Sequence, residues 1–265
     1  MVDNHNISTW SESIPPQAKV SVTSSLSVIY LNARSLVNKI NLLRSYALTY
    51  KPSIICVTET WANSNLPNAY FHIESFNIYR CDRSSSRGGG VMMYVTQKIK
   101  SCLRNDFSID NVEAITCEII LNDGSLLFSC VYVPPRHTWC RDSFIHYLYS
   151  ICDMKSSHNV ICGDFNRPDI NWSSDSICLS NDVLISWFMD NHLYQNVNVV
   201  TRPQSGTILD LIFSSIGTCV SNPSVSEMFG KSDHLILSFC IEHEPRKVRQ
   251  YLVIFLIITE LIGNV

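Results

Sequence analysis

Two polar side chains follow one apolar run in the middle of the sequence. Asp164 and Asn166 stand two positions apart, directly after the run 159–162 and Gly163. Because side chains two positions apart on a strand point to the same face, a carboxylate and an amide share one face of this strand tip. That pairing is typical of a metal-dependent phosphate site.

Further apolar runs along the chain also carry polar residues. Asn32 and Glu59 each end such a run, Asp210 lies inside one, and Asp233-His234 opens the last one. Taken singly, these residues also suit ordinary structural roles such as a turn former, a solvated carboxylate or a packed imidazole. Asp210 is the exception, because an unpaired carboxylate inside an apolar strand costs several kcal/mol and therefore needs a partner.

Six short motifs occur in one order along the chain. They are Leu31-Asn32-Ala33-Arg34, Thr58-Glu59-Thr60-Trp61, Val131-Tyr132-Val133-Pro134-Pro135, Gly163-Asp164-Phe165-Asn166, Leu209-Asp210-Leu211-Ile212 and Ser232-Asp233-His234. In order and spacing they resemble the endonuclease/exonuclease/phosphatase superfamily. Within it, phrases such as Arg87-Gly88-Gly89-Gly90-Val91 and Pro168-Asp169-Ile170-Asn171-Trp172 resemble the apurinic-type endonuclease domain of non-LTR retrotransposon polyproteins.

Strand-like and helix-like segments alternate between residues 27 and 241. Apolar runs predict strands at 27–31, 54–58, 91–95, 113–121, 126–133, 160–163, 208–213 and 235–241. Helical periodicity falls within 37–50, 144–154 and 182–191. Asn122-Asp123-Gly124 predicts a hairpin turn. The resemblance implies an α/β fold, the four-layer αββα sandwich of DNase-I-like proteins, with two central mixed sheets flanked by helices.

Length and composition indicate one globular domain. The 265 residues are 46% apolar and 16% charged. We expect a flexible lead-in over residues 1–25, the catalytic domain over 26–241, and a linker and truncated tail over 242–265. The resemblance implies a following reverse transcriptase domain, which this sequence lacks. Arg87-Gly88-Gly89-Gly90 lacks the ending of a phosphate-binding loop, and we expect a bulge or close backbone approach there.

The cysteine pattern favours an intracellular protein. Eleven cysteines show no Cys-x-x-Cys spacing, and several lie in apolar strands, so free buried thiols are expected rather than disulfides or zinc. The first residues lack a secretory signal, and the apolar stretch 251–258 is too short to span a membrane. We expect a monomer that is not secreted and has no membrane partner, and that is nuclear if it acts on chromosomal DNA.

The side chains at these strand ends favour a hard divalent cation. Carboxylate and amide oxygens suit Mg²⁺, with Mn²⁺ as a substitute. The resemblance implies that Glu59 is the principal metal ligand, with Asn32 and Asp233 completing the cation site. Repair-type enzymes of the superfamily have an acidic residue where this chain has Arg34, which favours a single-metal mechanism.

His234 needs a carboxylate to fix its tautomer. Asp233 is adjacent in sequence and faces the opposite way on a strand, so Asp210 is the candidate, and the family pairs the corresponding residues. The resemblance implies that Asp164 orients or deprotonates the attacking water. It also implies that Asn166 and Tyr132 hold phosphate oxygens. The residues leave open whether His234 or Asp164 is the general base.

The formal net charge of −3 does not indicate bulk electrostatic binding of DNA. Arginines nevertheless stand beside the motifs and could form a positive rim, although ordinary solvated loop arginines explain them equally well; they are Arg34, Arg136, Arg167 and Arg202. In the family, loops like 202–207 help to select the nicking site, so Gln204, Ser205 and Thr207 are candidate DNA contacts.

Three functions are compatible with this sequence. The first is a Mg²⁺-dependent endonuclease that hydrolyses a phosphodiester bond and nicks target DNA, leaving the 3′-hydroxyl group used in target-primed reverse transcription. The second is a small-molecule phosphoesterase of the same superfamily. The third is a catalytically decayed remnant that folds or binds nucleic acid without turnover. Activity on plasmid DNA and on soluble phosphoesters distinguishes them, and the motifs favour the first.

Overall fold

The computed structural model describes residues 25–84, 86–122, 124–135, 140–152, 158–172, 182–215, 218–221 and 223–243. Except for residues 25, 242 and 243, the predicted lead-in (1–25) and tail (242–265) lie outside the described residues. The candidate DNA contact Arg136 lies outside them as well.

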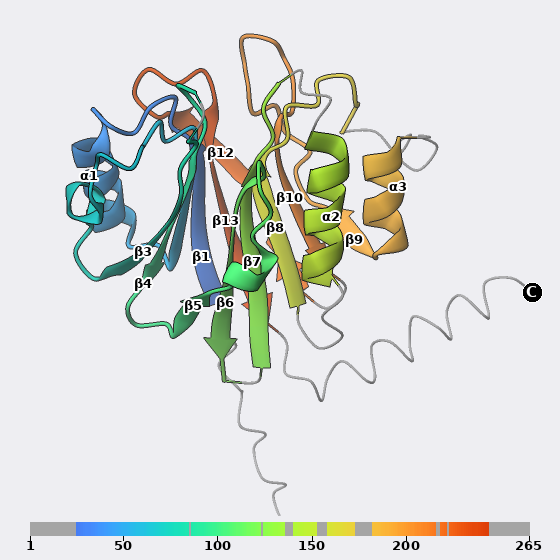
Figure 1. The fold of residues 1–265 in the computed structure, drawn as a ribbon, viewed down its shortest axis with the longest axis horizontal. Helices are drawn as coiled ribbons and strands as arrows, with labels where there is room; N and C mark the ends of the chain where they lie inside the picture. Colours follow the sequence, from blue (N-terminus) through green and yellow to red (C-terminus); the bar gives the residue numbers. More distant parts are fainter. Residues whose placement is uncertain are drawn as a thin grey trace, which may run out of the picture.

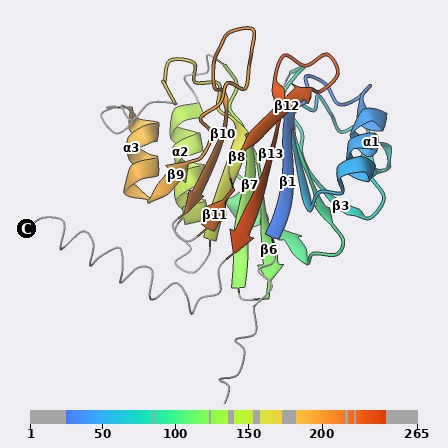
Figure 2. The same cartoon turned by 180° about the vertical axis from the view of Figure 1, so that it is seen from behind.

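One sheet contains seven strands from the beginning, middle and end of the chain. They are β1 (Ser25–Asn32), β2 (Ile54–Thr58), β3 (Phe76–Cys81), β4 (Val91–Thr96), β11 (Thr218–Val220), β12 (Ser224–Met228) and β13 (Leu235–His243). Their order is β11-β13-β1-β2-β4-β3, and β12 pairs with β13. Figure 2 shows β13 beside β1 in the middle of the molecule. Because β1 and β2 are parallel, both end at the same edge of this sheet.

The second sheet contains six strands from the central part of the chain. They are β5 (Ser101–Leu103), β6 (Glu113–Leu121), β7 (Gly124–Tyr132), β8 (His158–Asp164), β9 (Leu193–Gln195) and β10 (Asp210–Ser215). Their order is β5-β6-β7-β8-β10-β9. Strands β7 and β8 are parallel, so they also end together. The ends of both parallel pairs form the floor of the site described below.

Helices cover the outer faces of both sheets (Figure 1). Helix α1 (Ile40–Tyr50) packs on the first sheet, and α2 (Cys140–Cys152) and α3 (Val183–Asp190) lie beside the second. Two short 3₁₀ helices, η1 (Asn68–Phe71) and η2 (Asn105–Phe107), occur in loops. This arrangement confirms the predicted four-layer DNase-I-like sandwich.

The alternation of side chains along β1 explains the two cores. Val28 and Tyr30 face the second sheet and join the core between the sheets, whereas Ile29 and Leu31 face α1 and join a smaller core. Both faces of the strand are buried, so its sequence reads as a continuous apolar run rather than as an alternating one.

The predicted strands and helices all occur; β2 and β6 have the predicted ends, and the ends of the others are shifted. Strands β6 and β7 form a hairpin, with Leu121 paired to Gly124, and Asp123 of the predicted turn lies outside the described residues. The prediction omitted the five strands β3, β5, β9, β11 and β12. Three of them have only three residues, and β3 and β12 are partly or largely exposed, so neither shows a strong apolar pattern.

The glycine run at residues 88–90 makes the predicted close backbone approach. Gly89 has φ +62°, and a Cβ atom there would lie 2.3 Å from Oε2 of Glu113. The backbone N–H of Gly90 donates to the same carboxylate, and Arg83 pairs with Glu113 at 2.5 Å. The run therefore fixes the loop that approaches the end of β2.

Two further sequence expectations concern membranes and thiols. Among the described residues, no helix is both long and apolar enough to cross a membrane. Seven described cysteines are free thiols, and four of them are buried: Cys56, Cys117, Cys130 and Cys162.

Candidate active site

The strand register brings the predicted site residues to one edge of the sandwich. Asp164, at the end of β8, is paired with Tyr132 of β7 on one side and with Asp210 of β10 on the other. Asn32 ends β1 in the facing sheet, and His234 precedes β13. Residues that are as much as 202 positions apart in the chain thus meet at this edge.

Asp210 is fully buried, and both of its carboxylate oxygens have partners. Nδ1 of His234 lies 2.7 Å from Oδ2, and the hydroxyl group of Tyr30 donates to Oδ1 at 2.8 Å. The Asp210 backbone N–H donates to Oγ1 of Thr201 at 3.1 Å. The predicted contact between Asp210 and His234 therefore occurs, and it explains how this carboxylate is accommodated inside an apolar strand.

The contact with Asp210 controls the charge of His234. Burial by itself favours the neutral ring, but the charge and hydrogen bond of Asp210 outweigh it and raise the pKa of His234 to about 9. His234 is therefore cationic at neutral pH. With Nδ1 engaged by Asp210, Nε2 is the ring atom that can meet a substrate.

Asp164 is held by amides on two sides. The side-chain amide of Asn32 donates to Oδ2 at 2.9 Å, and the backbone N–H of Asn166 donates to Oδ1 at 3.0 Å. Burial, followed by the negative charge of Asp210, raises the pKa of Asp164 well above its usual value, although His234 acts in the opposite direction. The charged form of Asp164 therefore needs additional positive charge.

Glu59 stands in a loop of unusual backbone conformation. Glu59 and Trp61 have φ of 49° and 54°, in the left-handed region. Tyr132 donates its hydroxyl to Oε1 of Glu59 at 3.0 Å, and Nε1 of Trp61 approaches Oε2 at 3.3 Å. The guanidinium of Arg87 lies 5.1 Å from the Trp61 ring centre. These contacts fix the carboxylate that was predicted as the principal metal ligand.

Asn166 and Tyr132 are both committed to protein contacts. The amide of Asn166 donates to the carbonyl of Val133 at 2.8 Å, which uses one of its two N–H bonds. Burial and the charge of Glu59 raise the pKa of Tyr132, so its hydroxyl remains a donor. Both side chains lie near Asp164, but Asn166 stands beyond the end of β8 with φ of 47°, so strand alternation, on which its prediction rested, does not set the direction of its side chain.

Asp233 pairs with arginines. It lies 2.7 Å from Arg202 and 3.7 Å from Arg34, and although burial acts in the opposite direction, the hydrogen bond from Arg202 lowers the pKa of its carboxyl group. Two guanidinium groups thus already supply positive charge to the carboxylate that was predicted to complete a cation site.

The donor set fits a divalent cation. Asp164, Asp210 and His234 offer atoms that lie within 4.8 Å of one another, but a protonated His234 is not a ligand, so the carboxylate oxygens are the donors for a cation. Oxygen donors dominate, and the raised pKa of Asp164 reflects crowded negative charge, with Glu59 contributing to it. The structure thus groups two carboxylates that the sequence analysis assigned to catalysis, whereas the ligands predicted from the resemblance were Glu59, Asn32 and Asp233.

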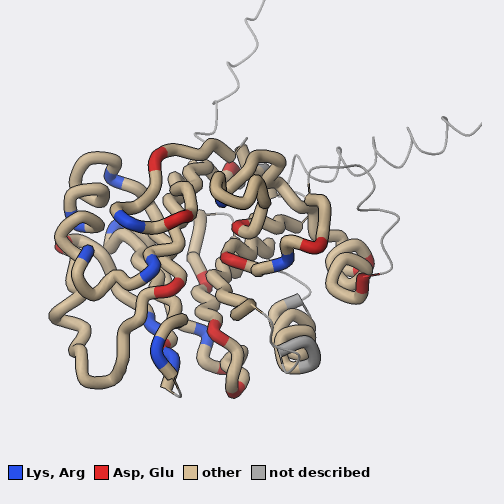
Figure 3. Tube along the Cα trace, turned by 90° about the horizontal axis from the view of Figure 1, so that it is seen from above, with Lys and Arg blue, Asp and Glu red and all other residues tan. Residues whose placement is uncertain are grey.

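The candidate DNA contacts differ in how far carboxylates already neutralise their charge. Arg34 is 57% exposed at its side chain, whereas Arg167 pairs with Asp169 and Asp182 at 2.6 and 2.7 Å. In Figure 3, most basic segments lie in the half of the molecule that carries α1. That half is the more favourable one for a polyanion.

A cleft of about 860 Å³ adjoins the carboxylates. Asn166, Leu209 and Phe144 contribute to its lining, and Ser205 and Thr207 reach it from the turn at residues 203–206. Gln204 is exposed on the same turn. The candidate selectivity loop therefore borders a cavity next to the site.

Sequence reasoning missed three residues of this site: Tyr30, Trp61 and Thr201. Tyr30 had a usable signal, because it stands two positions before Asn32 and must share its face of β1. Trp61 and Thr201 are in loops, where no periodicity indicates the direction of a side chain.

Comparison with known proteins gives a consistent picture of the fold. Residues 29–234 match the sequence profile of the Endonuclease/Exonuclease/phosphatase family. The chain is similar in structure to the endonuclease domain of TRAS1, a telomere-specific non-LTR retrotransposon (TM-score 0.65, 15% identity, covering 83% of this chain and 99% of that one). It is also similar to the AP endonuclease LMAP from Leishmania major (0.66, 14%, 83% and 88%). A third similar structure is the 3′ phosphatase NExo from Neisseria, bound to product DNA hairpin (0.60, 14%, 83% and 99%). No curated protein matches the sequence.

Proposed function

The chain belongs to the endonuclease/exonuclease/phosphatase family, and on that basis we propose that it is a Mg²⁺-dependent endonuclease that hydrolyses a phosphodiester bond in DNA. We further propose that it nicks the target site of a non-LTR retroelement. The structural similarity to the TRAS1 endonuclease domain supports this substrate, and the site geometry supports the hydrolysis.

One observation carries the proposal: a buried carboxylate, Asp210, holds the imidazole of His234 at 2.7 Å beside a second buried carboxylate, Asp164. This arrangement does not stabilise the core, because burying a charge without a counter-charge costs free energy. A phosphodiester needs a positive donor for its oxygens and an acceptor for the proton of water. His234 and Asp164 supply these two groups side by side.

We assign the donor role to His234 and the general base to Asp164. Because the pKa of His234 is raised, its Nε2–H is present at neutral pH and can hydrogen-bond a phosphate oxygen. Asn32 and Asn166 hold both oxygens of Asp164, which orients its remaining lone pairs toward water. Tyr132 is the proposed further donor to the phosphate, and its single hydroxyl hydrogen must turn from Glu59 to take that role.

Glu59 is the proposed principal ligand of the cation, and Asn32 and Asp233 are the proposed further ligands. When bound, the divalent ion supplies positive charge that polarises the phosphate and favours the ionised form of Asp164. The chain's own contribution is to fix Glu59 between Tyr132 and Trp61, so that its carboxylate is already oriented.

The DNA-binding surface is proposed to extend from the site toward α1. Arg34 and Arg202 lie at its rim, with the turn carrying Gln204, Ser205 and Thr207 beside the cleft. A nick leaving a 3′-hydroxyl group would serve a reverse transcriptase domain encoded by the element. Activity on chromosomal DNA would place the protein in the nucleus.

Nicking of supercoiled plasmid by the full chain tests the proposal. We expect relaxation with Mg²⁺, none with EDTA, and loss of activity in His234→Ala. His192→Ala is the matched control. It changes an exposed histidine in the turn after α3 and should remain active. A folded protein that releases phosphate from soluble phosphoesters and leaves plasmid intact would support the phosphoesterase alternative. Plasmid binding without any turnover would support a decayed remnant.

A further inference from the structure

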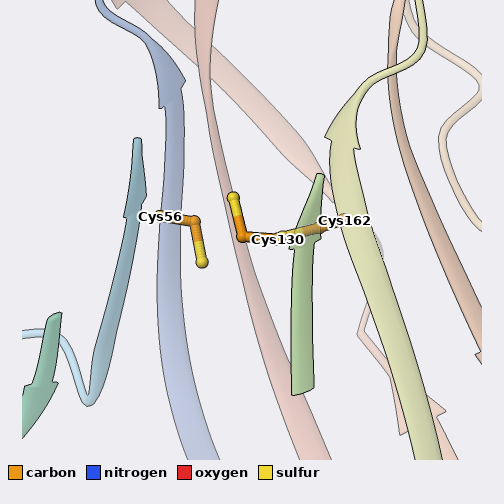
Figure 4. Close-up of side chains that lie close together, drawn as sticks. All are labelled: Cys56, Cys130 and Cys162. Atoms are coloured by element: carbon orange, nitrogen blue, oxygen red, sulfur yellow. The ribbon is translucent and has the colours of Figure 1, made fainter. Parts of the chain in front are cut away.

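Three buried cysteines meet in the core between the two sheets. Cys56 comes from β2, while Cys130 and Cys162 are register partners on β7 and β8. None of the three is exposed, and their sulfur atoms lie within 4.8 Å of one another. Figure 4 shows Cys56 reaching from its sheet toward the two cysteines of the other sheet.

The cysteines lie directly beneath the candidate active site. Cys130 and Cys162 each stand two positions before Tyr132 and Asp164, which are also register partners. Two strand residues rise about 6.6 Å and return the side chain to the same face. The thiol row therefore forms the layer immediately below the row that holds the proposed general base.

We propose that Cys56, Cys130 and Cys162 form a three-sulfur site that takes a trivalent thiophilic ion, for which arsenite is the probe. The spacing suits three-coordination: an ion about 2.3 Å from each of three sulfurs, the usual Zn–S length, separates those sulfurs by about 4 Å. The sulfur atoms lie within 4.8 Å of one another, so they need to close by at most about 0.8 Å to reach that spacing. Among the described residues, no fourth His, Cys, Asp or Glu ligand joins the group.

Charge selects the trivalent ion. Three thiolates with a monovalent or divalent cation leave a net negative charge, and an apolar core opposes it strongly. Asp210 and Asp164 in the layer above add to this opposition. Three thiolates with a trivalent ion are neutral. Zinc is disfavoured for a second reason, because its structural sites almost always have four ligands.

The overall reaction is neutral. Arsenous acid is neutral, and burial raises the pKa of Cys56 and Cys130, so both sulfurs remain protonated. Burial acts in the same direction on Cys162, but hydrogen bonds from Cys130 and Cys56 lower the pKa of its thiol to about 6, so Cys162 is the first of the three to give up its proton. Each thiol loses its proton to one hydroxyl group of As(OH)₃, an As–S bond replaces an As–O bond, and three water molecules leave. No atom is oxidised or reduced. The product links β2 to β7 and β8 through one arsenic atom.

Such a link resembles a disulfide in its effect, because it restricts the unfolded chain and joins two sheets. It also stabilises the native protein by mass action, since the unfolded chain does not hold the three thiols together. The inference is independent of the proposed nuclease activity, because every measurement below is made without substrate.

The full reduced chain is incubated with arsenite, passed through a desalting column and analysed by intact mass spectrometry. We expect one adduct per chain with the mass of one arsenic less three hydrogens, the loss of three titratable thiols, and a higher melting temperature. X-ray absorption at the arsenic edge should show three sulfur neighbours. Cys130→Ala should lower the affinity for arsenite at least about tenfold.

Cys117→Ala is the matched control. Cys117 is a fully buried free thiol on β6 outside the cluster, so this variant should retain the arsenic. Cys130→Ser, a smaller change, provides a second variant if Cys130→Ala does not fold. The proposal is overturned if the wild type retains no arsenic, or if only two sulfur atoms, or oxygen atoms, surround the arsenic. It is also overturned if Cys117→Ala loses as much arsenic as Cys130→Ala. Retention of zinc in preference to arsenic would also overturn it.

Discussion

The hydroxyl group of Tyr30 lies 2.8 Å from Oδ1 of Asp210, the carboxylate oxygen opposite the one that contacts His234. A second contact, 2.9 Å to Oγ1 of Thr58, holds the same hydroxyl. Burial and the charge of Asp210 raise the pKa of Tyr30, so the hydroxyl keeps its proton and remains a donor. Tyr30 thus fixes the orientation of the carboxylate that in turn holds the imidazole.

Tyr30→Phe should weaken catalysis through this chain of contacts. Without the donor, Asp210 can rotate and its ionised form loses a hydrogen bond, so we expect nicking to fall by about tenfold or more. The basic limb of the pH profile and the His234 pKa measured by NMR should both shift. Unfolding free energy should fall by about 1 to 2 kcal/mol.

Tyr94→Phe separates this effect from simple loss of stability. Tyr94 is equally buried and donates to the carbonyl of Phe71 at 2.9 Å, but it belongs to the core beneath α1. It should lose comparable stability and keep the wild-type pH profile. Equal changes in the pH profile of both variants would show that Tyr30 has only a structural role.

The pair formed by His234 and Asp210 should make stability depend on pH. Unfolded histidine titrates near 6.5, and in the fold the charge of Asp210 outweighs the effect of burial and raises the pKa of His234 to about 9. A raised histidine pKa contributes stability that is complete below about pH 6.5 and is lost as the pH rises through about 9. The shift corresponds to at most about 3 kcal/mol.

Urea unfolding in EDTA across this pH window measures the loss. Asp210→Asn should flatten the curve between pH 6.5 and 9, and the His234 resonance should titrate near its ordinary value. A wild-type slope in Asp210→Asn would mean that another group controls the titration. EDTA is needed because a cation bound at this edge of the sheets would change the charge around the pair.

Asp164→Asn should separate stability from activity. Its carboxyl pKa is raised, first by burial and then by Asp210, so ionising it in the absence of a cation destabilises the fold. The amide has no charge to lose, but its NH₂ group replaces an oxygen that accepts from Asn32 or Asn166, so without Mg²⁺ the variant should be close to wild type in stability at neutral pH. Nicking should fall by at least about a hundredfold, because the base is gone.

Asp169→Asn is the control for this substitution. Asp169 is an exposed carboxylate paired with Arg167, so its loss should leave plasmid nicking close to wild type. If Asp164→Asn nicked at the wild-type rate, another group would have to be the general base.

The sequence was sufficient to pair Asp210 with His234. Asp210 inside an apolar run required a partner, and His234 needed a carboxylate to fix its tautomer, which paired the two residues. Asp233 and His234 precede β13, so the strand-alternation argument that excluded Asp233 does not apply to them. His234 comes from the segment before β13 in the other sheet, and its Nδ1 reaches Oδ2 of Asp210 at 2.7 Å. The layer order followed from the family resemblance of the six motifs.

The remaining contacts depend on loop geometry, which no periodic pattern encodes. Glu59 and Trp61 adopt positive φ, so the direction of both side chains departs from the strand rule. The commitment of Arg167 to two carboxylates depends on where α3 begins, at the cap residue Asp182. Likewise, the meeting of Cys56 with Cys130 depends on how two sheets stack, which single-strand patterns do not determine.

Gly89→Ala should disrupt the loop that approaches Glu59. The backbone N–H of Trp61 donates to the carbonyl of Gly89 at 2.9 Å, and an added Cβ would lie 2.3 Å from Oε2 of Glu113. Gly206→Ala is the matched control, since Gly206 has nearly the same φ, +65°, with open space around its Cβ position. The control should cost about 1 kcal/mol from backbone strain alone. Gly89→Ala should cost clearly more in chemical denaturation and raise the Mg²⁺ concentration needed for nicking. Equal costs would mean that the close approach does not constrain the loop.

Arg34 should contribute to DNA affinity in proportion to its unneutralised charge. Its side chain is 57% exposed, and its ion pair with Asp233, at 3.7 Å, is longer than that of Arg202 at 2.7 Å. Each arginine that contacts a phosphate adds about one unit to the slope of log affinity against log salt. Arg34→Ala should therefore reduce plasmid affinity and lower that slope by about one unit. Arg44, on α1, donates instead to the carbonyls of His72 and Tyr70. Arg44→Ala should leave the slope unchanged. A lower slope in Arg44→Ala together with an unchanged slope in Arg34→Ala would place the DNA on a different face.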